Sequence, residues 1–301
     1  MSLPLPLIHP RHWPTWLGLG FLRMLVALPQ RGRMAIGHRI GRLLMPLIKR
    51  RVQITDINIG LAFPELDDEQ RKRRVRAHIE SQFLGLIELG MAWWCHDREI
   101  TRLTTITGIE HLQTALNEGH GVILLSAHLA PLDLSVRALG LQLPFDFTYR
   151  PHQNPVLNYL LRHHRERNGK HHIPRDDVRE LLNTLKSGRA VWYASDQNFG
   201  HKNSVFADFF GIPAATNTAL SRIVKLSDAR VVPYFYRRLE NDTGYIVEVL
   251  PALDDFPGMN PAADALRINA LIEAAVRKAP EQYYWSHRRY KDRPGNAPRY
   301  Y

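Results

Sequence analysis

Cysteine is almost absent from this 301-residue chain, in which Cys95 stands alone. A single cysteine excludes an internal disulfide and gives no basis for a cysteine-based metal site. His171 and His172 have no suitably spaced histidine or carboxylate to complete a ligand set, so we predict no metal site. Cys95 follows Trp93 and Trp94 on an apolar segment, and we interpret it as a core or interface residue rather than a nucleophile.

Acidic residues are missing from the first 55 positions, which contain nine Lys or Arg and no Asp or Glu. A long apolar run is missing as well, because Arg23 interrupts the apolar residues 17–28 and a membrane-spanning helix needs about 20. The stretch also lacks a charged leader followed by a cleavage site, so we do not interpret it as a signal peptide.

Residues 34–48 place apolar side chains on one helical face, with Arg39 and Arg42 off that face. Basic amphipathic helices with tryptophans at the boundary, such as Trp13 and Trp16, are typical of membrane interfaces. We therefore predict that residues 1–55 form basic amphipathic or apolar helices that associate with a membrane. The alternative is an ordinary amphipathic helix packed on the domain.

The whole chain is basic, with 40 Lys and Arg against 29 Asp and Glu and a formal net charge of +11. Such a balance favours an anionic partner, and nucleic acid, a phospholipid surface and an acidic carrier protein all qualify. No recognisable nucleic-acid-binding module accompanies the charge, so we predict no nucleic-acid partner.

Residues 56–301 are predicted to form a single α/β domain, helical over 56–100 and α/β over 101–301. The alternation of strands and helices predicts a mixed, mainly parallel sheet wrapped by helices. Strands are predicted at Thr104–Thr107, Val122–Ser126, Phe145–Tyr149, Ala190–Ala194, Val231–Tyr236 and Tyr245–Leu250. Helices are predicted at Glu110–Asn117, Leu132–Leu141, Asn154–Arg165, Asp176–Lys186, Asn217–Leu226 and Ala262–Arg277, with a polar loop before Asn217.

The strand at 122–126 leads directly to His128, and Asp133 follows after four residues at the predicted start of a helix. A neutral imidazole backed by a carboxylate is a suitable base for taking a proton from an alcohol near neutral pH. On spacing alone, the structural interpretation is favoured, in which His128 is a buried histidine bonded to backbone and Asp133 is a first-turn acid favoured by the helix dipole.

Two further strand ends carry polar groups: Arg150 and Asp196. Because ligands of α/β sheets bind beyond the carboxyl ends of strands, these groups and His128 define a candidate site for an anionic substrate with a reacting hydroxyl. Arg165 and Arg167 leave the helix that begins beyond Arg150, and an arginine there is suited to gripping a phosphate.

At this point the chain resembles a known family. The His128 and Asp133 spacing is similar to the H-x4-D/E motif of glycerolipid and lipid A acyltransferases. Other stretches resemble the bacterial late acyltransferases of lipid A biosynthesis, of the lauroyl/myristoyl type. They include Tyr149-Arg150-Pro151, Trp192-Tyr193-Ala194-Ser195-Asp196-Gln197-Asn198, Phe209-Phe210-Gly211 and Trp285-Ser286-His287-Arg288-Arg289-Tyr290-Lys291. The residues between His128 and Asp133 depart from the usual family sequence, and the acid is Asp rather than the frequent Glu.

The resemblance implies a glycerolipid-acyltransferase-like fold and transfer of a fatty acyl group from acyl carrier protein to a hydroxyl of a lipid A precursor, in lipopolysaccharide biosynthesis. We expect His128 to be the general base and Asp133 to orient it, with backbone N–H groups at the following helix start stabilising the oxyanion. The family match adds Arg165 and Asp196 as substrate-binding candidates, and Arg150 as a weaker one.

The same resemblance implies no cofactor beyond the acyl carrier protein co-substrate, and a place at the cytoplasmic face of the inner membrane of a Gram-negative bacterium, on its anionic surface. Two alternatives stay open from the sequence. One is an acyltransferase of this group acting on a lysophospholipid, ornithine lipid or mannolipid. The other is a non-enzymatic basic protein that binds membrane or nucleic acid.

Overall fold

A seven-stranded sheet forms the centre of the computed structural model, which describes residues 4–166, 171–198, 200–201 and 203–301. The strand order is β1-β9-β8-β2-β5-β3-β4, and β6 and β7 form a separate two-stranded sheet. The strands are β1 (Thr104–Thr107), β2 (Val122–Ser126), β3 (Asp146–Tyr149), β4 (His172–Pro174), β5 (Ala190–Ala194), β6 (Ser204–Phe209), β7 (Ile212–Asn217), β8 (Arg230–Arg238) and β9 (Tyr245–Val249). In the large sheet β8 and β9 pair antiparallel and the other neighbours pair in parallel, so the predicted mixed, mainly parallel sheet is confirmed.

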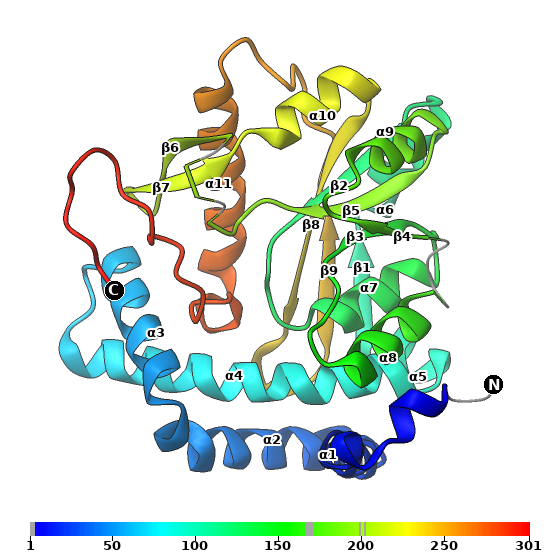
Figure 1. Cartoon of the computed structure of the whole chain (residues 1–301), viewed down its shortest axis with the longest axis vertical. Coiled ribbons are helices and arrows are strands. Elements are labelled where there is room, and N and C mark those ends of the chain that lie inside the picture. Colours follow the sequence, from blue (N-terminus) through cyan, green and yellow to red (C-terminus); the bar gives the residue numbers. More distant parts are fainter. Residues whose placement is uncertain (1–3, 167–170, 199, 202) are drawn as a thin grey trace.

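Helices surround this sheet (Figure 1). They are α1 (Trp13–Val26), α2 (Gln30–Leu44), α3 (Lys49–Ala62), α4 (Asp68–Trp94), α5 (Asp97–Leu103), α6 (Ile109–Asn117), α7 (Leu132–Gly140), α8 (Pro155–Arg165), α9 (Val178–Lys186), α10 (Ala219–Ser227) and α11 (Pro261–Lys278). Short 3₁₀ turns are η1 (Leu5–Ile8), η2 (Pro10–His12), η3 (Met45–Ile48), η4 (Glu240–Asp242) and η5 (Pro280–Gln282). Every residue of β2 is buried, as expected for a central strand whose two faces are both covered by helices.

The hairpin β6–β7 differs from the polar loop predicted before residue 217. Its two-residue turn consists of Phe210 and Gly211, which have φ angles of 53° and 71°. Two-residue hairpin turns of this kind need positive φ at both positions, and Asn-Gly or Asp-Gly is their usual sequence. Because phenylalanine is unusual at the first position, the sequence gives no signal for this turn. The short edge strand β4 was not predicted either.

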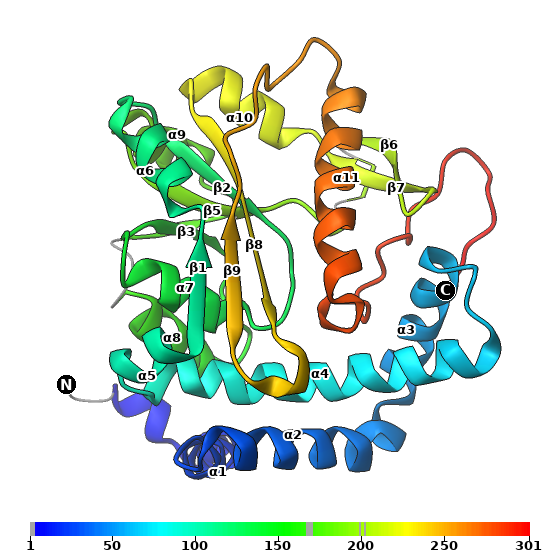
Figure 2. The same ribbon diagram turned by 180° about the vertical axis from the view of Figure 1, so that it is seen from behind.

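Helices α1 and α2 form a layer beneath α4, on the side of that helix away from the sheet, and α3 runs upward across one end of α4 (Figures 1 and 2). A capping box formed by Asp67 and Gln70 begins the 27-residue α4. This helix is long enough for α1, α2 and α3 all to pack against it. Helix α3 runs without a break across residues 55 and 56, the boundary predicted between a membrane-associating segment and the α/β domain. None of the helices in the described ranges combines the length and the apolar character needed to cross a membrane.

An ionic network joins α2 to α4 and to the β8–β9 connection. The His38 ring lies between Glu80, 2.7 Å from Nδ1, and Asp242, 2.9 Å from Nε2. The hydrogen bond with Asp242 raises the pKa of His38 above 6.5, burial opposes it, and the hydrogen bond with Glu80 adds to the rise. Because the folded-state pKa is raised, this contribution to stability is complete below pH 6.5 and is lost as the pH rises through the raised pKa.

Close contact between α2 and α4 depends on glycine, and this gives a stability prediction. A Cβ built on Gly41 would lie 2.8 Å from the Cα of Glu80, whereas one on Gly20 of α1 meets nothing within 4 Å. We expect Gly41→Ala to lower the free energy of unfolding by about 1–3 kcal/mol, because backbone must move. Gly20→Ala, the matched control, should raise it by about 0.5–1 kcal/mol through helix propensity. Urea denaturation of both variants checks this, and equal effects would contradict the packing argument.

Candidate active site

His128 and Asp196 lie side by side because their strands are neighbours. Strands β2 and β5 pair in parallel with Ser126 opposite Ala194, so the residues two positions further on also meet. The Asp196 carboxylate accepts two hydrogen bonds from His128, from ring Nδ1 at 2.7 Å and from the backbone N–H at 2.9 Å. Asp196 is 1% exposed, whereas the His128 side chain is 32% exposed. The structure thus pairs a buried carboxylate with a ring that solvent or substrate can reach.

Asp133, predicted to orient His128, contacts Arg165 instead. Its Oδ1 accepts a hydrogen bond of 2.7 Å from Arg165 Nε. Asp133 lies in the first turn of α7 and Arg165 is the last residue of α8, so the pair joins two helix ends. The predicted hydrogen-bond partner of His128 is therefore wrong, because parallel strand pairing, rather than sequence proximity, decides which acid meets the ring.

The electrostatics of the pair suit a proton acceptor. Burial lowers the pKa of His128, but the charge and hydrogen bond of Asp196 outweigh it, and the net effect is a pKa raised above 6.5. For Asp196, burial acts to raise the pKa, and its contacts with His128 bring it below the ordinary value. Because Nδ1 donates to an ionised carboxylate, the neutral ring carries its lone pair on Nε2. That nitrogen has no hydrogen-bond partner within the described part of the chain.

Arg165 completes the charged part of this corner. Its side chain is 21% exposed, and its charge acts on His128 by lowering the pKa of the ring. Burial lowers the pKa of Arg165 itself, but the Asp133 carboxylate raises it above the ordinary value, so the guanidinium stays charged. Asp133 thus holds a cation near His128 rather than the ring of His128 itself.

A carboxy-terminal segment, residues 280–287, closes the corner from another direction. Tyr284 N–H donates to the carbonyl of His128 at 3.0 Å, and Ala130 N–H donates to the carbonyl of Gln282 at 2.8 Å. The Tyr283 hydroxyl donates to the backbone carbonyl of Asp196 at 3.3 Å. We did not predict this segment to be part of the site. The cluster of aromatic and polar residues after position 282 was the available signal.

The backbone donors predicted to stabilise an oxyanion lie at the start of α7, and the two N–H groups that precede this helix are occupied. The N–H of Leu129 donates to Ala127 at 2.9 Å, and that of Ala130 donates to Gln282 as described above. Pro131 has no N–H. The first two donors beyond His128 are therefore engaged within the protein.

His287 lies next to the pair. The backbone N–H of Asn198, two residues after Asp196, donates to His287 Nε2 at 3.1 Å. Burial lowers the pKa of His287 to about 4, with Asp196 opposing the shift and His128 adding to it. His287 is therefore neutral at pH 7, and its electrostatic coupling to both residues places it within the same corner.

Arg150 does not join this cluster. It is exposed directly after β3, which is separated from β2 by β5. Arg167 lies outside the described residues. Within the described ranges, no group of three or more His, Cys, Asp or Glu side chains is arranged to hold a metal ion.

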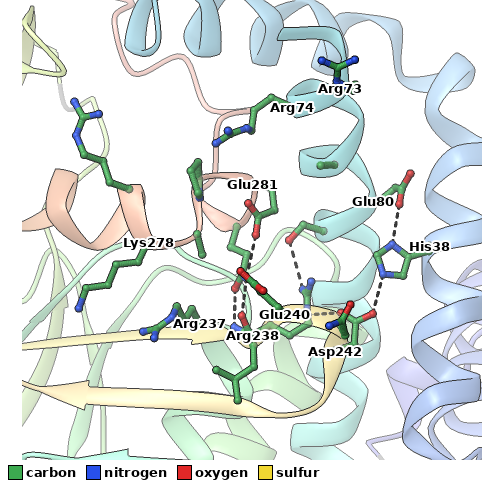
Figure 3. A pocket seen from close by; sticks show the side chains of 18 of the residues that line it. His38, Arg73, Arg74, Glu80, Arg237, Arg238, Glu240, Asp242, Lys278 and Glu281 are labelled. Atoms are coloured by element: carbon green, nitrogen blue, oxygen red, sulfur yellow. Dashed lines mark hydrogen bonds and ion pairs between the residues drawn. The ribbon is translucent and has the colours of Figure 1, made fainter. Parts of the chain in front are cut away.

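A large cavity of about 1440 Å³ lies elsewhere, between α4, the end of β8 and the end of α11 (Figure 3). Both signs of charge line it, and three of its six Lys and Arg side chains form ion pairs with glutamates. Arg238 is held by the fully buried Glu88 at 2.6 Å, and Arg237 and Lys278 both contact Glu248. Gln282 lines this cavity with its side chain while its backbone carbonyl binds Ala130. The cavity thus adjoins the carboxy-terminal segment but not His128 itself.

Comparison with known proteins gives consistent results. Residues 5–292 match the family described as bacterial lipid A biosynthesis acyltransferase. The chain is 37% identical over 296 residues to the lipid A biosynthesis lauroyltransferase of Escherichia coli K12, covering 98% of this chain and 97% of that protein. It is 36% identical over 288 residues to the lipid A biosynthesis palmitoleoyltransferase of the same organism, covering 95% and 94%.

Among solved structures, the 1-acyl-sn-glycerophosphate acyltransferase of Thermotoga maritima matches with a TM-score of 0.39 and 15% identity, over 84% of this chain and 98% of that one. The family assignment rests instead on the sequence match, which extends over nearly the whole chain, including the strand ends that carry His128 and Asp196. The resemblance noted in the motifs is thereby confirmed, and the chain belongs to the bacterial lipid A biosynthesis acyltransferase family.

Proposed function

We propose that this protein transfers a fatty acyl group from acyl carrier protein to a hydroxyl of a lipid A precursor. The observation that supports the chemistry is the hydrogen bond between His128 and the buried Asp196, which leaves Nε2 of an accessible ring as a base. The family name supports lipid A biosynthesis as the setting. The acyl carrier protein as donor follows from the family resemblance and from the basic character of the chain.

In the proposed reaction His128 Nε2 takes the proton of the acceptor hydroxyl as its oxygen attacks the thioester carbonyl carbon. Asp196 holds the ring and stabilises the imidazolium that forms. The tetrahedral intermediate then collapses, the carbon–sulfur bond breaks, and the imidazolium returns the proton to the departing thiolate. Ester and free thiol are the products, and atoms and charges balance without a cofactor.

Arg165 is our candidate for stabilising negative charge on the intermediate. Asp133 fixes its Nε, and the charge of the guanidinium is felt at His128. A preorganised cation in a partly buried site is effective where charge develops. We propose that Arg165 acts together with the backbone N–H groups at the start of α7, since those of Leu129 and Ala130 are engaged within the protein. Arg150 remains a weaker candidate for contact with an anionic substrate.

A direct transfer fits the environment of the lone cysteine. Cys95 is buried at the end of α4, and Arg33 donates to its sulfur at 3.5 Å. Burial raises the pKa of the Cys95 thiol, which disfavours the thiolate needed for an acyl-enzyme. We therefore propose no covalent intermediate on this residue.

We further propose that the protein works at the cytoplasmic face of the inner membrane, with α1 on the lipid surface. One face of α1 exposes large apolar side chains at helical spacing. They are Trp13 (59% exposed), Leu17 (75%), Phe21 (49%) and Met24 (65%). Arg11 and Arg23, which lie close in sequence to Trp13 and Met24, supply positive charge beside this stripe, which suits an anionic lipid surface.

Vesicle binding tests the surface assignment. Leu17→Ser/Met24→Ser should weaken binding to phosphatidylglycerol vesicles at least roughly tenfold, because two large side chains no longer enter the lipid. The matched control is Met259→Ser/Leu266→Ser, which changes two exposed residues at α11 by the same chemistry. Binding should also weaken as salt rises. Equal binding of both double variants in a flotation assay would refute the assignment.

Lipid extraction tests the activity. Cells without this protein should contain lipid A lighter by one acyl group, and the mass difference identifies the chain transferred. Unchanged lipid A with a missing acyl group on a lysophospholipid, ornithine lipid or mannolipid would instead support the alternative acceptors. No change in any lipid would favour a non-enzymatic role.

A further inference from the structure

A cavity of about 590 Å³ adjoins the His128 corner on the side of His287. Its lining combines the first turn of α3 with the carboxy-terminal segment and the loop after β5. The lining residues are Arg50, Arg51, Ile54, Asn198, Ser286, His287, Arg288 and Lys291. We call it the basic cavity, because four of these side chains are cationic and none is acidic.

The cations of the basic cavity are not neutralised by the protein. None of the four forms an ion pair with a carboxylate in the described part of the chain. Arg51 donates to the backbone carbonyl of Ser286 at 3.0 Å, and Arg288 lies over the ring of Tyr301. The cavity of Figure 3 differs in part, because Arg237, Arg238 and Lys278 there form ion pairs with Glu248 and Glu88, and carboxylates such as Glu240 and Glu281 line its wall. Four clustered cations without counter-charge repel one another and favour a bound anion.

Two further features provide hydrogen-bond donors for an anion. Arg50 and Arg51 lie in the first turn of the 14-residue α3, where the partial positive charge of the helix N-terminus adds to theirs. His287 accepts from Asn198 at Nε2, so its neutral ring carries the proton on Nδ1. That N–H has no acceptor in the described part of the chain.

The basic cavity lies close to Asp196 along the chain and in space. Asn198, which lines it, follows Asp196 by two residues, and its backbone N–H contacts His287. The charges of Asp196 and His128 both act on His287. A group bound in the basic cavity is therefore held at a fixed offset from the base.

We propose that the basic cavity binds a phosphate monoester on the sugar headgroup of the acceptor and thereby positions the reacting hydroxyl at His128. Arginine side chains bind phosphate through paired N–H groups, and Arg50, Arg51 and Arg288 reach the cavity from two walls. This inference rests on the proposed acyl transfer to a sugar-containing lipid. It assigns a phosphate-binding subsite to the part of the site that binds the acceptor.

The kinetic test compares a phosphorylated acceptor with the same acceptor after phosphatase treatment. Arg50→Gln/Arg51→Gln should lower kcat/KM for the phosphorylated acceptor at least about tenfold, and less than about twofold for the dephosphorylated one. Arg288→Gln, from the opposite wall, should show the same selectivity. The matched control is Arg73→Gln/Arg74→Gln, another adjacent arginine pair that lines the cavity of Figure 3, and it should show no such selectivity. Equal losses on both acceptors would overturn the proposal.

A binding test works without turnover and so separates this proposal from the proposed function. Burial lowers the pKa of His287 to about 4, and a bound phosphate monoanion, the form present near that pH, should raise the value observed in NMR spectra. Inorganic phosphate and glucosamine 1-phosphate are the probes, and glucosamine is the control without phosphate. We expect both phosphates to raise the pKa in the wild-type protein but not in Arg50→Gln/Arg51→Gln. No response in the wild type would overturn the proposal even if acyl transfer is confirmed.

Phosphatidylglycerol vesicles distinguish a headgroup site from a membrane contact. Arg50→Gln/Arg51→Gln should change vesicle binding less than about twofold beyond the effect of the Arg73→Gln/Arg74→Gln control. A loss on vesicles as large as the loss on the phosphorylated acceptor would assign the basic cavity to the membrane surface and overturn the proposal. If the wild type acylates neither acceptor while His287 still responds to phosphate, the proposed function fails and the anion site stands.

Discussion

Replacing His128 with alanine is expected to lower the turnover number for acyl transfer by roughly 10²–10⁴-fold, the usual contribution of a positioned general base. The variant removes Nε2, which is the unoccupied nitrogen of a partly exposed ring. Turnover is measured as transfer of a labelled acyl group from acyl carrier protein to a lipid A precursor.

A second variant guards against a trivial loss of folding. His128→Gln keeps the backbone N–H that donates to Asp196 and a side-chain donor of similar reach, but it cannot act as a base. Both variants should unfold near the wild-type temperature and both should be slow. Near-wild-type turnover in either folded variant would show that the proton goes elsewhere.

Asp196→Asn is expected to reduce turnover by a similar factor, roughly 10²–10⁴-fold, because the ring loses its orienting charge and the imidazolium its stabilisation. The pH profile gives an independent readout. The base acts in its neutral form, so the rate rises with pH up to the pKa of His128, which Asp196 holds above 6.5. Without the carboxylate charge, burial and Arg165 still lower that pKa, so the acid limb of the profile should move to lower pH.

Asp133→Asn provides the comparison within the same motif. Asp133 contacts Arg165 rather than His128, so its loss weakens the placement of the cation and should leave the acid limb near its wild-type position. The reduction in turnover should be smaller than for Asp196→Asn. A shifted limb in Asp133→Asn together with an unshifted one in Asp196→Asn would show that the wrong acid has been assigned to the base.

Much of the fold can be predicted from sequence patterns, because buried parallel strands consist of short apolar runs. Three predicted strands, β1, β2 and β5, agree with the structure residue for residue. The hairpin β6–β7 was not predicted, because Phe210 occupies a turn position where glycine or asparagine is usual. Its partner strands also alternate weakly between buried and exposed positions.

The residues of the candidate site were predicted from the sequence, but the hydrogen bonds between them were not. Sequence reasoning placed His128, Arg150 and Asp196 at strand ends on one edge of a sheet. It could not know that β5 lies directly beside β2, with β3 one strand further away, and that order decides the contacts. A spacing of four residues suggested Asp133, whereas the strand register selected an acid 68 residues away.

The carboxy-terminal segment was missed for a related reason. Its contacts with His128 and Ala130 are backbone hydrogen bonds, which any sequence can form and no motif announces. Side chains of the segment also contact the loop after β5: the Tyr283 hydroxyl reaches the carbonyl of Asp196, and His287 Nε2 accepts from the N–H of Asn198.

That same segment bears on when the protein becomes active during its synthesis. His128 is held through its own carbonyl by Tyr284, and Ala130 is held by Gln282, more than 150 residues later in the chain. Translation proceeds from the amino terminus, and early elements such as α1 to α4 emerge first. A nascent chain therefore has α1 to α4 before the contacts around His128 can form, so the lipid contact proposed for α1 comes before the proposed activity in every newly made molecule.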